Sequence, residues 1–179
     1  MLGAHLNEVV IAVDIGSSGI KALGFDLRAQ PVPGVGARAA FALSNGAFDF
    51  GVLKSSVESV LDEIYAQTNQ LEVLGVGFGS FASSLIALNQ NGTVLEPSLS
   101  YADTRSAAQL EGWHGDATLT QRTGCPPYTS FWTAQIAWWL ASNARPSRFV
   151  TVTDALFAGW FSLEQVRCSL LNYVFENVF

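Results

Sequence analysis

Hydrophobic and polar positions in the first part of the chain form short runs that predict strands. The run Glu8–Asp14 is almost continuously apolar and β-branched, which is typical of a strand buried on both faces. A turn at Ile15–Gly19 follows, and Ile20–Leu27 resumes a strand pattern. Because so short a connection cannot hold a crossover helix, the two strands are expected to form an antiparallel hairpin. After a loop at Pro31–Gly34, the segment Ala37–Leu43 predicts a third strand.

The rest of the chain alternates between helical and strand patterns. Apolar residues recur at helical spacing over Val52–Gln67, which predicts a helix with one buried face. Leu74–Phe78 predicts a short buried strand, and the dipeptide Asn91-Gly92 predicts a hairpin between two further strands. Those strands are expected at residues 85–89 and 93–95, and two later helices at residues 131–142 and after Thr153, a candidate N-cap.

This order of elements predicts a mixed α/β fold. A sheet that opens with an antiparallel meander and carries helices on its faces accommodates it. A doubly wound parallel sheet would need a helix directly after the first strand, so a Rossmann fold at the N-terminus is excluded. The 179 residues contain no repeat, linker or low-complexity tract, and they predict one domain or a piece of a larger one.

Composition narrows the set of partners. Charged residues make up only 13% of the chain and hydrophobic residues 49%, so either much of the chain is core or some surface expects a partner. The net charge is −6 and the arginines are scattered, which argues against nucleic acid and against an anionic membrane surface. The N-terminus resembles neither a signal peptide nor a membrane span. The cysteines and histidines lack the spacing of metal ligands; they are Cys125, Cys168, His5 and His114. The two cysteines are therefore predicted to be reduced thiols, which is typical of a cytoplasmic protein.

The segment DIGSSGIK, residues 14–21, carries the clearest candidate chemistry. Asp14 ends an apolar strand, so its carboxylate can project from the sheet edge and hold Mg²⁺, directly or through water. The glycines permit close backbone approach, and the serines offer hydroxyl and N–H groups that can cradle phosphate oxygens. Lys21 can neutralise charge on a transferred phosphoryl group. Taken alone, an ordinary hairpin with an Asp/Gly/Ser turn explains the segment equally well.

The same segment resembles the phosphate-binding hairpin of the FGGY carbohydrate kinases, in the actin/hexokinase-like superfamily. The family pattern is Asp-x-Gly-[Ser/Thr]-[Ser/Thr]-x-x-[Lys/Arg], then Ala and Phe-Asp, and it is matched from Asp14 through Ala22 to Phe25-Asp26. Three further segments match in order: Leu74–Leu88 resembles a strand and substrate loop, residues 101–105 an aromatic-x-Asp-x-Arg motif, and residues 123–126 a Thr-Gly-x-Pro motif. The last two look most like the gluconokinase-type branch.

The resemblance runs from about Val9 to Leu170 and implies a ribonuclease H-like (actin/hexokinase-like ATPase) domain. It implies ATP and Mg²⁺ as cofactors and a small-molecule sugar or sugar acid, gluconate- or xylulose-like, as the substrate. The residues that it assigns are Asp14 for the metal, Gly16, Ser17, Ser18 and Lys21 for phosphate, and Ser80, Ser83, Asp103 and Arg105 for the sugar.

The sugar side departs from the family in places. Family members often carry a Met-His pair at the positions of Ala82 and Ser83, and a lysine or similar residue at that of Gln135, which leaves the identity of the sugar open. The pair Trp138-Trp139 is expected to be core packing rather than a platform for sugar stacking.

Asp103 and Arg105 alternate in sequence, so on an extended chain both would point to one face. A carboxylate and a guanidinium there suit sugar hydroxyls, and Arg105 also suits a sugar-acid carboxylate. Without the resemblance, a surface ion pair would be the simpler interpretation.

The family's catalytic Asp and its second, ATP-closing domain lie beyond the matched span, and phosphoryl transfer needs both. Residues 171–179 (LNYVFENVF) fit neither the family nor a polar C-terminus, which suggests a frameshift or premature stop. The domain is therefore expected to be incomplete at the C-terminus and inactive alone. The missing C-terminal kinase domain is an expected partner, and a homodimer is left open. Two alternatives remain: a non-catalytic sugar-binding or interaction module, and a ribonuclease H-like nuclease, which would need several converging carboxylates.

Overall fold

The computed structural model describes residues 7–113 and 115–161. His5, His114, Cys168 and the segment 171–179 lie outside the described residues. The chain divides into two compact units, the first comprising residues 1–43 and 51–81 and the second residues 44–50 and 82–179. Within the described residues, no helix is long and apolar enough to cross a membrane.

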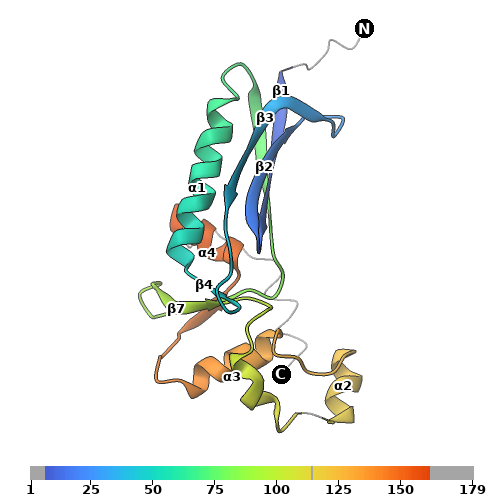
Figure 1. The fold of residues 1–179 in the computed structure, drawn as a ribbon, viewed down its shortest axis with the longest axis vertical. Coiled ribbons are helices and arrows are strands. Elements are labelled where there is room, and N and C mark those ends of the chain that lie inside the picture. The colour runs from blue at the N-terminus through green and yellow to red at the C-terminus, as the bar shows by residue number, and fades with distance from the viewer. Residues whose placement is uncertain (1–6, 114, 162–179) are drawn as a thin grey trace. The chain divides into compact units, whose positions relative to one another are not determined.

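The first unit contains a four-stranded sheet in the order β3-β2-β1-β5 (Figure 1). Strand β1 pairs antiparallel with β2 and parallel with β5, and β2 pairs antiparallel with β3. The meander predicted from the short connections is therefore confirmed. The strands are β1 (Glu8–Gly16), β2 (Gly19–Phe25), β3 (Pro31–Ala40) and β5 (Glu72–Ser80).

Helix α1 (Phe50–Ala66) lies along one face of this sheet (Figure 1) and confirms the helix predicted at residues 52–67. Its apolar residues recur every three or four positions, so one stripe of the helix is buried, made of Leu53, Val57, Val60 and Ile64. Directly after the C-terminal end of the helix, the Gln67 side chain accepts the Gly36 N–H at 2.7 Å and donates to the Gly36 carbonyl at 3.1 Å, which ties the segment to β3. The buried sheet residues include Val9, Ile11, Val13, Ile15 and Ile20.

The expectation that the first strand is buried on both faces is wrong. Along β1, buried residues alternate with exposed ones, and Val10, Ala12 and Asp14 are exposed. The reason is that α1 covers one face of the sheet, while the β-branched content of the strand says nothing about its second face. Strand β5 is also longer than predicted and is half-exposed rather than buried, since it lies at the sheet edge.

The predicted loop at Pro31–Gly34 is also wrong, because β3 already begins at Pro31. Proline cannot donate a hydrogen bond to a neighbouring strand, so it is tolerated on edge strands. Strand β3 is such an edge, paired only with β2 among the described strands.

The second unit contains an antiparallel sheet in the order β4-β7-β6-β8. The hairpin predicted at Asn91-Gly92 joins β6 to β7 and is confirmed. The two outer strands have only two and three residues, too few for a hydrophobic pattern to reveal them in the sequence. The strands are β4 (Ala47–Phe48), β6 (Leu85–Leu88), β7 (Val94–Leu99) and β8 (Arg148–Val150).

The described part of the second unit also contains four helical segments: the 3-10 helix η1 (Arg105–Leu110), α2 (Ala117–Thr123), α3 (Trp132–Ala141) and α4 (Val152–Trp160). The residues Leu85, Ala87, Leu99 and Trp139 form one buried cluster, which packs α3 against the sheet. Helix α3 agrees with the predicted helix to within a residue at each end, whereas η1 and α2 were not predicted.

The N-cap of α4 is Thr151 rather than the predicted Thr153. The Thr151 hydroxyl oxygen accepts the Asp154 N–H at 3.1 Å, and the Asp154 carboxylate accepts the Thr151 N–H at 3.2 Å. This reciprocal capping box explains the correction, because only Thr151 has an acidic residue three positions later at the first turn.

Candidate functional site

The predicted phosphate-binding segment forms the hairpin between β1 and β2. Asp14 lies opposite Lys21 in the register and Gly16 opposite Gly19, so only Ser17 and Ser18 form the turn. Directly opposed residues of an antiparallel pair project from the same face. Both Asp14 and Lys21 are exposed there, and neither makes an ion pair within the described part of the chain.

Ser80 lies beside this hairpin. In the parallel register between β1 and β5, Asp14 pairs with Gly79 and Ile15 with Ser80. The Phe81 N–H then donates to the Ile15 carbonyl at 3.0 Å. The first unit thus brings Ser80 to the same end of the sheet as the hairpin.

Glycines leave open space next to Asp14. On β5, Gly77 pairs with Ala12 of β1 and Gly79 with Asp14, and a Cβ atom at either glycine would meet nothing within 4 Å. At the turn the opposite holds, since a Cβ at Gly16 would lie 3.0 Å from the Gly19 carbonyl oxygen. The glycines therefore serve two purposes here: a tight turn, and room beside the carboxylate.

The residues at the hairpin fit Mg²⁺. Within residues 7–113 and 115–161, no group of three or more His, Cys, Asp and Glu side chains could hold a metal ion by itself. Magnesium, however, usually takes one or two carboxylates and completes its shell with water and phosphate oxygens. Asp14, exposed and next to open space, is a donor of that kind.

Asp103 and Arg105 form an ion pair in the second unit. The Asp103 side chain is 1% exposed, its Oδ1 accepts the Arg105 N–H at 2.9 Å, and its Oδ2 lies 3.4 Å from Arg105 Nε. Because Thr104 has φ −111° and ψ 5° and η1 starts at Arg105, the chain is not extended there, so the two side chains meet across a turn and not by the alternation of a strand. The burial of Asp103 also distinguishes this pair from a surface ion pair.

Arg105 additionally lies over an aromatic ring. Its Cζ is 5.8 Å from the centroid of the Trp138 ring, within the range of a cation–π interaction. Trp138 in turn meets Trp139 edge-on at 5.1 Å, and Trp139 is 2% exposed. The expectation of core packing is confirmed for both residues, since Trp139 belongs to the buried cluster and Trp138 packs against it while its ring also supports the Arg105 guanidinium.

The turn that carries Asp103 rests on residues that sequence reasoning missed. Ser100 donates its hydroxyl to the Gly46 carbonyl at 2.6 Å. Gly46 has φ +79°, and a Cβ there would lie 2.5 Å from the carbonyl atoms of Ala102 and from Asp103 Cα. The dipeptide Asn45-Gly46 is a turn signal that could have revealed this position, although not what it contacts.

The remaining predicted residues are placed as follows. Ser83 belongs to the second unit and has φ +53°, between the end of β5 and the start of β6. In the Thr-Gly-x-Pro motif, Gly124 is the C-cap of α2 with φ +79°, and the Thr123 hydroxyl donates to the Cys125 carbonyl at 2.8 Å. The structure therefore collects the candidate residues into two groups, one within each unit: Asp14, Gly16, Ser17, Ser18, Lys21 and Ser80 in the first, and Ser83, Asp103 and Arg105 in the second.

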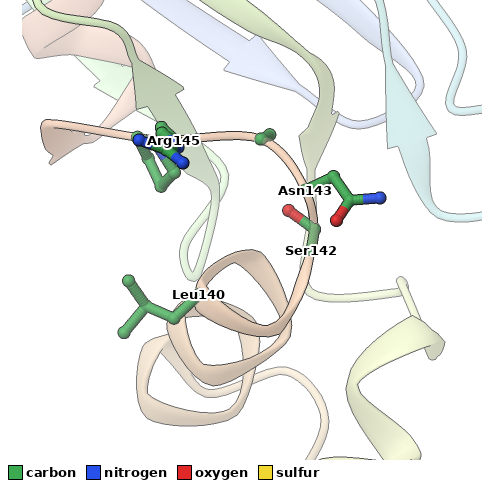
Figure 2. Close-up of a pocket in the computed structure, with 6 residues that line it drawn as sticks. Leu140, Ser142, Asn143 and Arg145 are labelled. Carbon is green, nitrogen blue, oxygen red and sulfur yellow. The ribbon is translucent and has the colours of Figure 1, made fainter.

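A cavity of about 410 Å³ lies elsewhere in the second unit, after the end of α3 (Figure 2). Figure 2 shows Leu140 on the last turn of the helix and Ser142, Asn143 and Arg145 on the connection to β8. None of the residues predicted to bind phosphate or sugar lines it: the lining residues are Leu140, Ser142, Asn143, Ala144, Arg145 and Pro146.

No protein-family model and no curated protein sequence matches the chain. Solved structures do match. Gluconate kinase from Lactobacillus acidophilus aligns with a TM-score of 0.75 and 14% identity, over 84% of this chain and 32% of that one. Xylulose kinase from Rhodospirillum rubrum aligns with a TM-score of 0.72 and 20% identity, over 83% of this chain and 33% of that one. Plasmodium falciparum glycerol kinase with ADP aligns with a TM-score of 0.71 and 14% identity, over 84% of this chain and 34% of that one.

The chain has a sugar-kinase fold. This confirms the fold class that the FGGY resemblance implied, a mixed sheet with helices of the actin-like ATPase type. The chain spans about a third of the length of these solved kinases. At such low identity the likeness concerns the fold, so the roles of Asp14, Lys21, Asp103 and Arg105 stay predictions.

Proposed function

We propose that the chain is the N-terminal part of an ATP-dependent carbohydrate kinase, which transfers the γ-phosphate to a hydroxyl of a gluconate- or xylulose-like sugar or sugar acid. The observation that carries this proposal is the β1–β2 hairpin, where Asp14 and Lys21 face each other on an exposed surface beside a two-serine turn. The sugar-kinase fold around the hairpin supports it.

On the phosphate side, the hairpin would bind the nucleotide. Asp14 would hold Mg²⁺ together with phosphate oxygens, and the metal would supply charge neutralisation on the phosphates. The N–H and hydroxyl groups of Ser17 and Ser18 would donate hydrogen bonds to phosphate oxygens, since consecutive backbone N–H groups in a tight turn make an anion-binding hollow. Lys21, which has no carboxylate partner within the described residues, would complete the neutralisation.

On the sugar side, Asp103 and Arg105 of the second unit would provide complementary groups, with Ser83 of the same unit as an additional hydroxyl contact. The Oδ2 atom of Asp103 is buried, lies 3.4 Å from Arg105 Nε and has no hydrogen-bond partner among the described residues, so part of its acceptor capacity is unused there. The Arg105 side chain is 35% exposed and uses its Nε toward Asp103. Its terminal nitrogens are then left to donate to a second hydroxyl or, in pairs, to a sugar-acid carboxylate.

Turnover is proposed to need a further kinase domain as a partner, because the chain corresponds to about a third of the solved kinases. A catalytic base must accept the proton of the substrate hydroxyl, and the resemblance assigns none within this chain. The chain alone would then bind ligands without phosphorylating them. A homodimer is an alternative assembly, which sedimentation velocity would distinguish from a monomer.

The test uses the two lysines of the chain as a matched pair. MgATP binding is measured by calorimetry for the wild type, Lys21→Met and Lys54→Met. Lys54 forms an i,i+4 ion pair with Glu58 on α1, away from the hairpin register, and serves as the control. We expect Lys21→Met to weaken binding by about tenfold or more, since a charge-assisted contact to phosphate is lost, and Lys54→Met to leave it unchanged.

Turnover is assayed in parallel as ADP production with gluconate, xylulose, ribulose or glycerol. We expect no sugar-dependent ADP from this chain, and robust production with one sugar would overturn the claim of inactivity. Binding of a sugar with no binding of MgATP would favour the alternative of a non-catalytic sugar-binding module. Equal effects of the two lysine substitutions would contradict the role of the hairpin.

A further inference from the structure

Gln135 is a fully buried polar residue on α3 that meets the turn carrying Asp103. Its side chain is 0% exposed, and its Nε2 donates to the Ser100 carbonyl oxygen at 2.8 Å, across 35 residues of sequence. The same oxygen accepts the Asp103 N–H at 3.2 Å. One carbonyl oxygen therefore joins the carboxamide of Gln135 to the backbone of Asp103.

The Asp103 turn has few other connections to the rest of the unit. Ser100 contributes its hydroxyl, which donates to Gly46 and accepts the Ala102 N–H at 3.1 Å. Among the described residues, the Asp103 carboxylate forms its hydrogen bond and its ion pair with Arg105, its neighbour two residues away. Helix α3 therefore meets this turn through two side chains: Trp138, which lies under the Arg105 guanidinium, and Gln135, which supplies the hydrogen bond to Ser100.

The carboxamide of Gln135 is a poor choice for stability alone. Its Oε1 is buried and has no hydrogen-bond partner within the described residues. An unpaired acceptor in the interior costs more than one neutral hydrogen bond returns, so an apolar side chain of similar size would serve the core as well or better. What an apolar side chain could not supply is the hydrogen bond to Ser100.

We propose that Gln135 is a positioning residue of the sugar site, which acts through the Ser100 carbonyl to orient the turn and carboxylate of Asp103. Its effect on ligands rests on the proposed function, because Asp103 is the residue assigned to the sugar. Its effect on the turn does not, since the shared carbonyl oxygen is present without any ligand. Removing the carboxamide leaves the Ser100 carbonyl with the Asp103 N–H alone, and the turn opens more often.

The test replaces the carboxamide with an apolar group of similar length, Gln135→Met, in the full 179-residue chain. Amide hydrogen exchange is followed residue by residue by NMR, together with the melting temperature. We expect exchange at the Asp103 amide to be about tenfold faster, as for the loss of one hydrogen bond, and the melting temperature to stay the same or rise. In sugar titrations by calorimetry, we expect Kd to increase by about tenfold.

Two control variants lie on the same helix. Thr133→Ala changes an exposed residue, and Ile136→Val trims a partly buried one that packs on the core cluster and whose side chain cannot hydrogen-bond to Ser100. In neither variant should hydrogen exchange at the Asp103 amide be faster than its change in the free energy of global unfolding accounts for. Gln135→Leu is a second variant, to be used if Gln135→Met fails to fold.

A purely structural role for Gln135 predicts a different result. The melting temperature would then fall, and exchange would accelerate uniformly through α3 and the sheet, which would overturn the proposal, as would unchanged exchange at Asp103. If the wild-type chain binds no sugar, the proposed function fails while the exchange measurement still decides the role of Gln135.

Discussion

The Asp103 turn makes a sharp stability prediction at Gly46. The substitution Gly46→Ala adds one methyl group at a position where φ is +79° and where the new Cβ would lie 2.5 Å from the backbone of Ala102 and Asp103. Backbone atoms cannot rotate away as the end of a flexible side chain can. The turn, the strand β4 that follows Gly46, or both must therefore shift.

The expected cost has two parts. Placing alanine in the left-handed region costs about 1–2 kcal/mol relative to glycine. Forcing a methyl group into an occupied position typically costs a further 1–3 kcal/mol or so, and a backbone contact belongs at the upper end. The sum of about 2–5 kcal/mol is a large part of the roughly 5–15 kcal/mol by which small domains are stable.

Gly92 offers a matched control in the same unit. Its φ is +77°, but a Cβ there would meet nothing within 4 Å, so Gly92→Ala carries the conformational cost without the clash. All five tryptophans lie between residues 113 and 160, so their fluorescence during urea denaturation follows the second unit. The free energy of unfolding should fall by about 1–2 kcal/mol for Gly92→Ala and by at least about 1 kcal/mol more for Gly46→Ala.

Equal destabilisation of the two variants would refute the reasoning, since it would mean that the turn does not close on Gly46. A further consequence concerns the site. Because the displaced atoms include Asp103 Cα, Gly46→Ala should also weaken sugar binding under conditions where the protein remains folded, while Gly92→Ala should not.

Two further substitutions test the packing of each unit. Ile64→Ala empties a fully buried position of α1 and should cost about 2–5 kcal/mol, followed by far-UV circular dichroism because the first unit contains no tryptophan. Its exposed neighbour is the control, and Tyr65→Ala should change stability by less than about 0.5 kcal/mol. Thr151→Ala removes the capping box of α4 and should cost about 1 kcal/mol in urea denaturation followed by fluorescence. A larger loss for Thr153→Ala would mean that the helix begins where its sequence first suggested.

The pairing of neighbouring strands and the position of the first helix could be predicted from the sequence. The connection between the first two strands is too short for anything but a hairpin, and the spacing of Val57, Val60 and Ile64 leaves little choice but a helix with one buried face. The same holds for the hairpin at Asn91-Gly92. In each case, residues within a few positions of one another determine the geometry.

Which residues are buried was harder to predict from the sequence, because burial depends on what packs on each face of a strand. Five of the nine residues of β1 are β-branched, yet buried residues alternate with exposed ones along the strand because α1 covers one face. Pro31 likewise indicated a loop until the sheet order placed its strand at an edge. A hydrophobic pattern reports which residues favour the interior, not how many layers the fold provides.

The chain's sequence by itself determined the phosphate hairpin and the identity of the candidate residues, because Asp14 to Lys21 are brought together by a turn of two residues. Only the tertiary structure decided the environment of Asp103. Its turn depends on Gly46, 54 residues before Ser100, and on Gln135, 35 residues after it. Such contacts exist only once the sheet and α3 have packed, since no local preference carries information about a partner so distant in the chain.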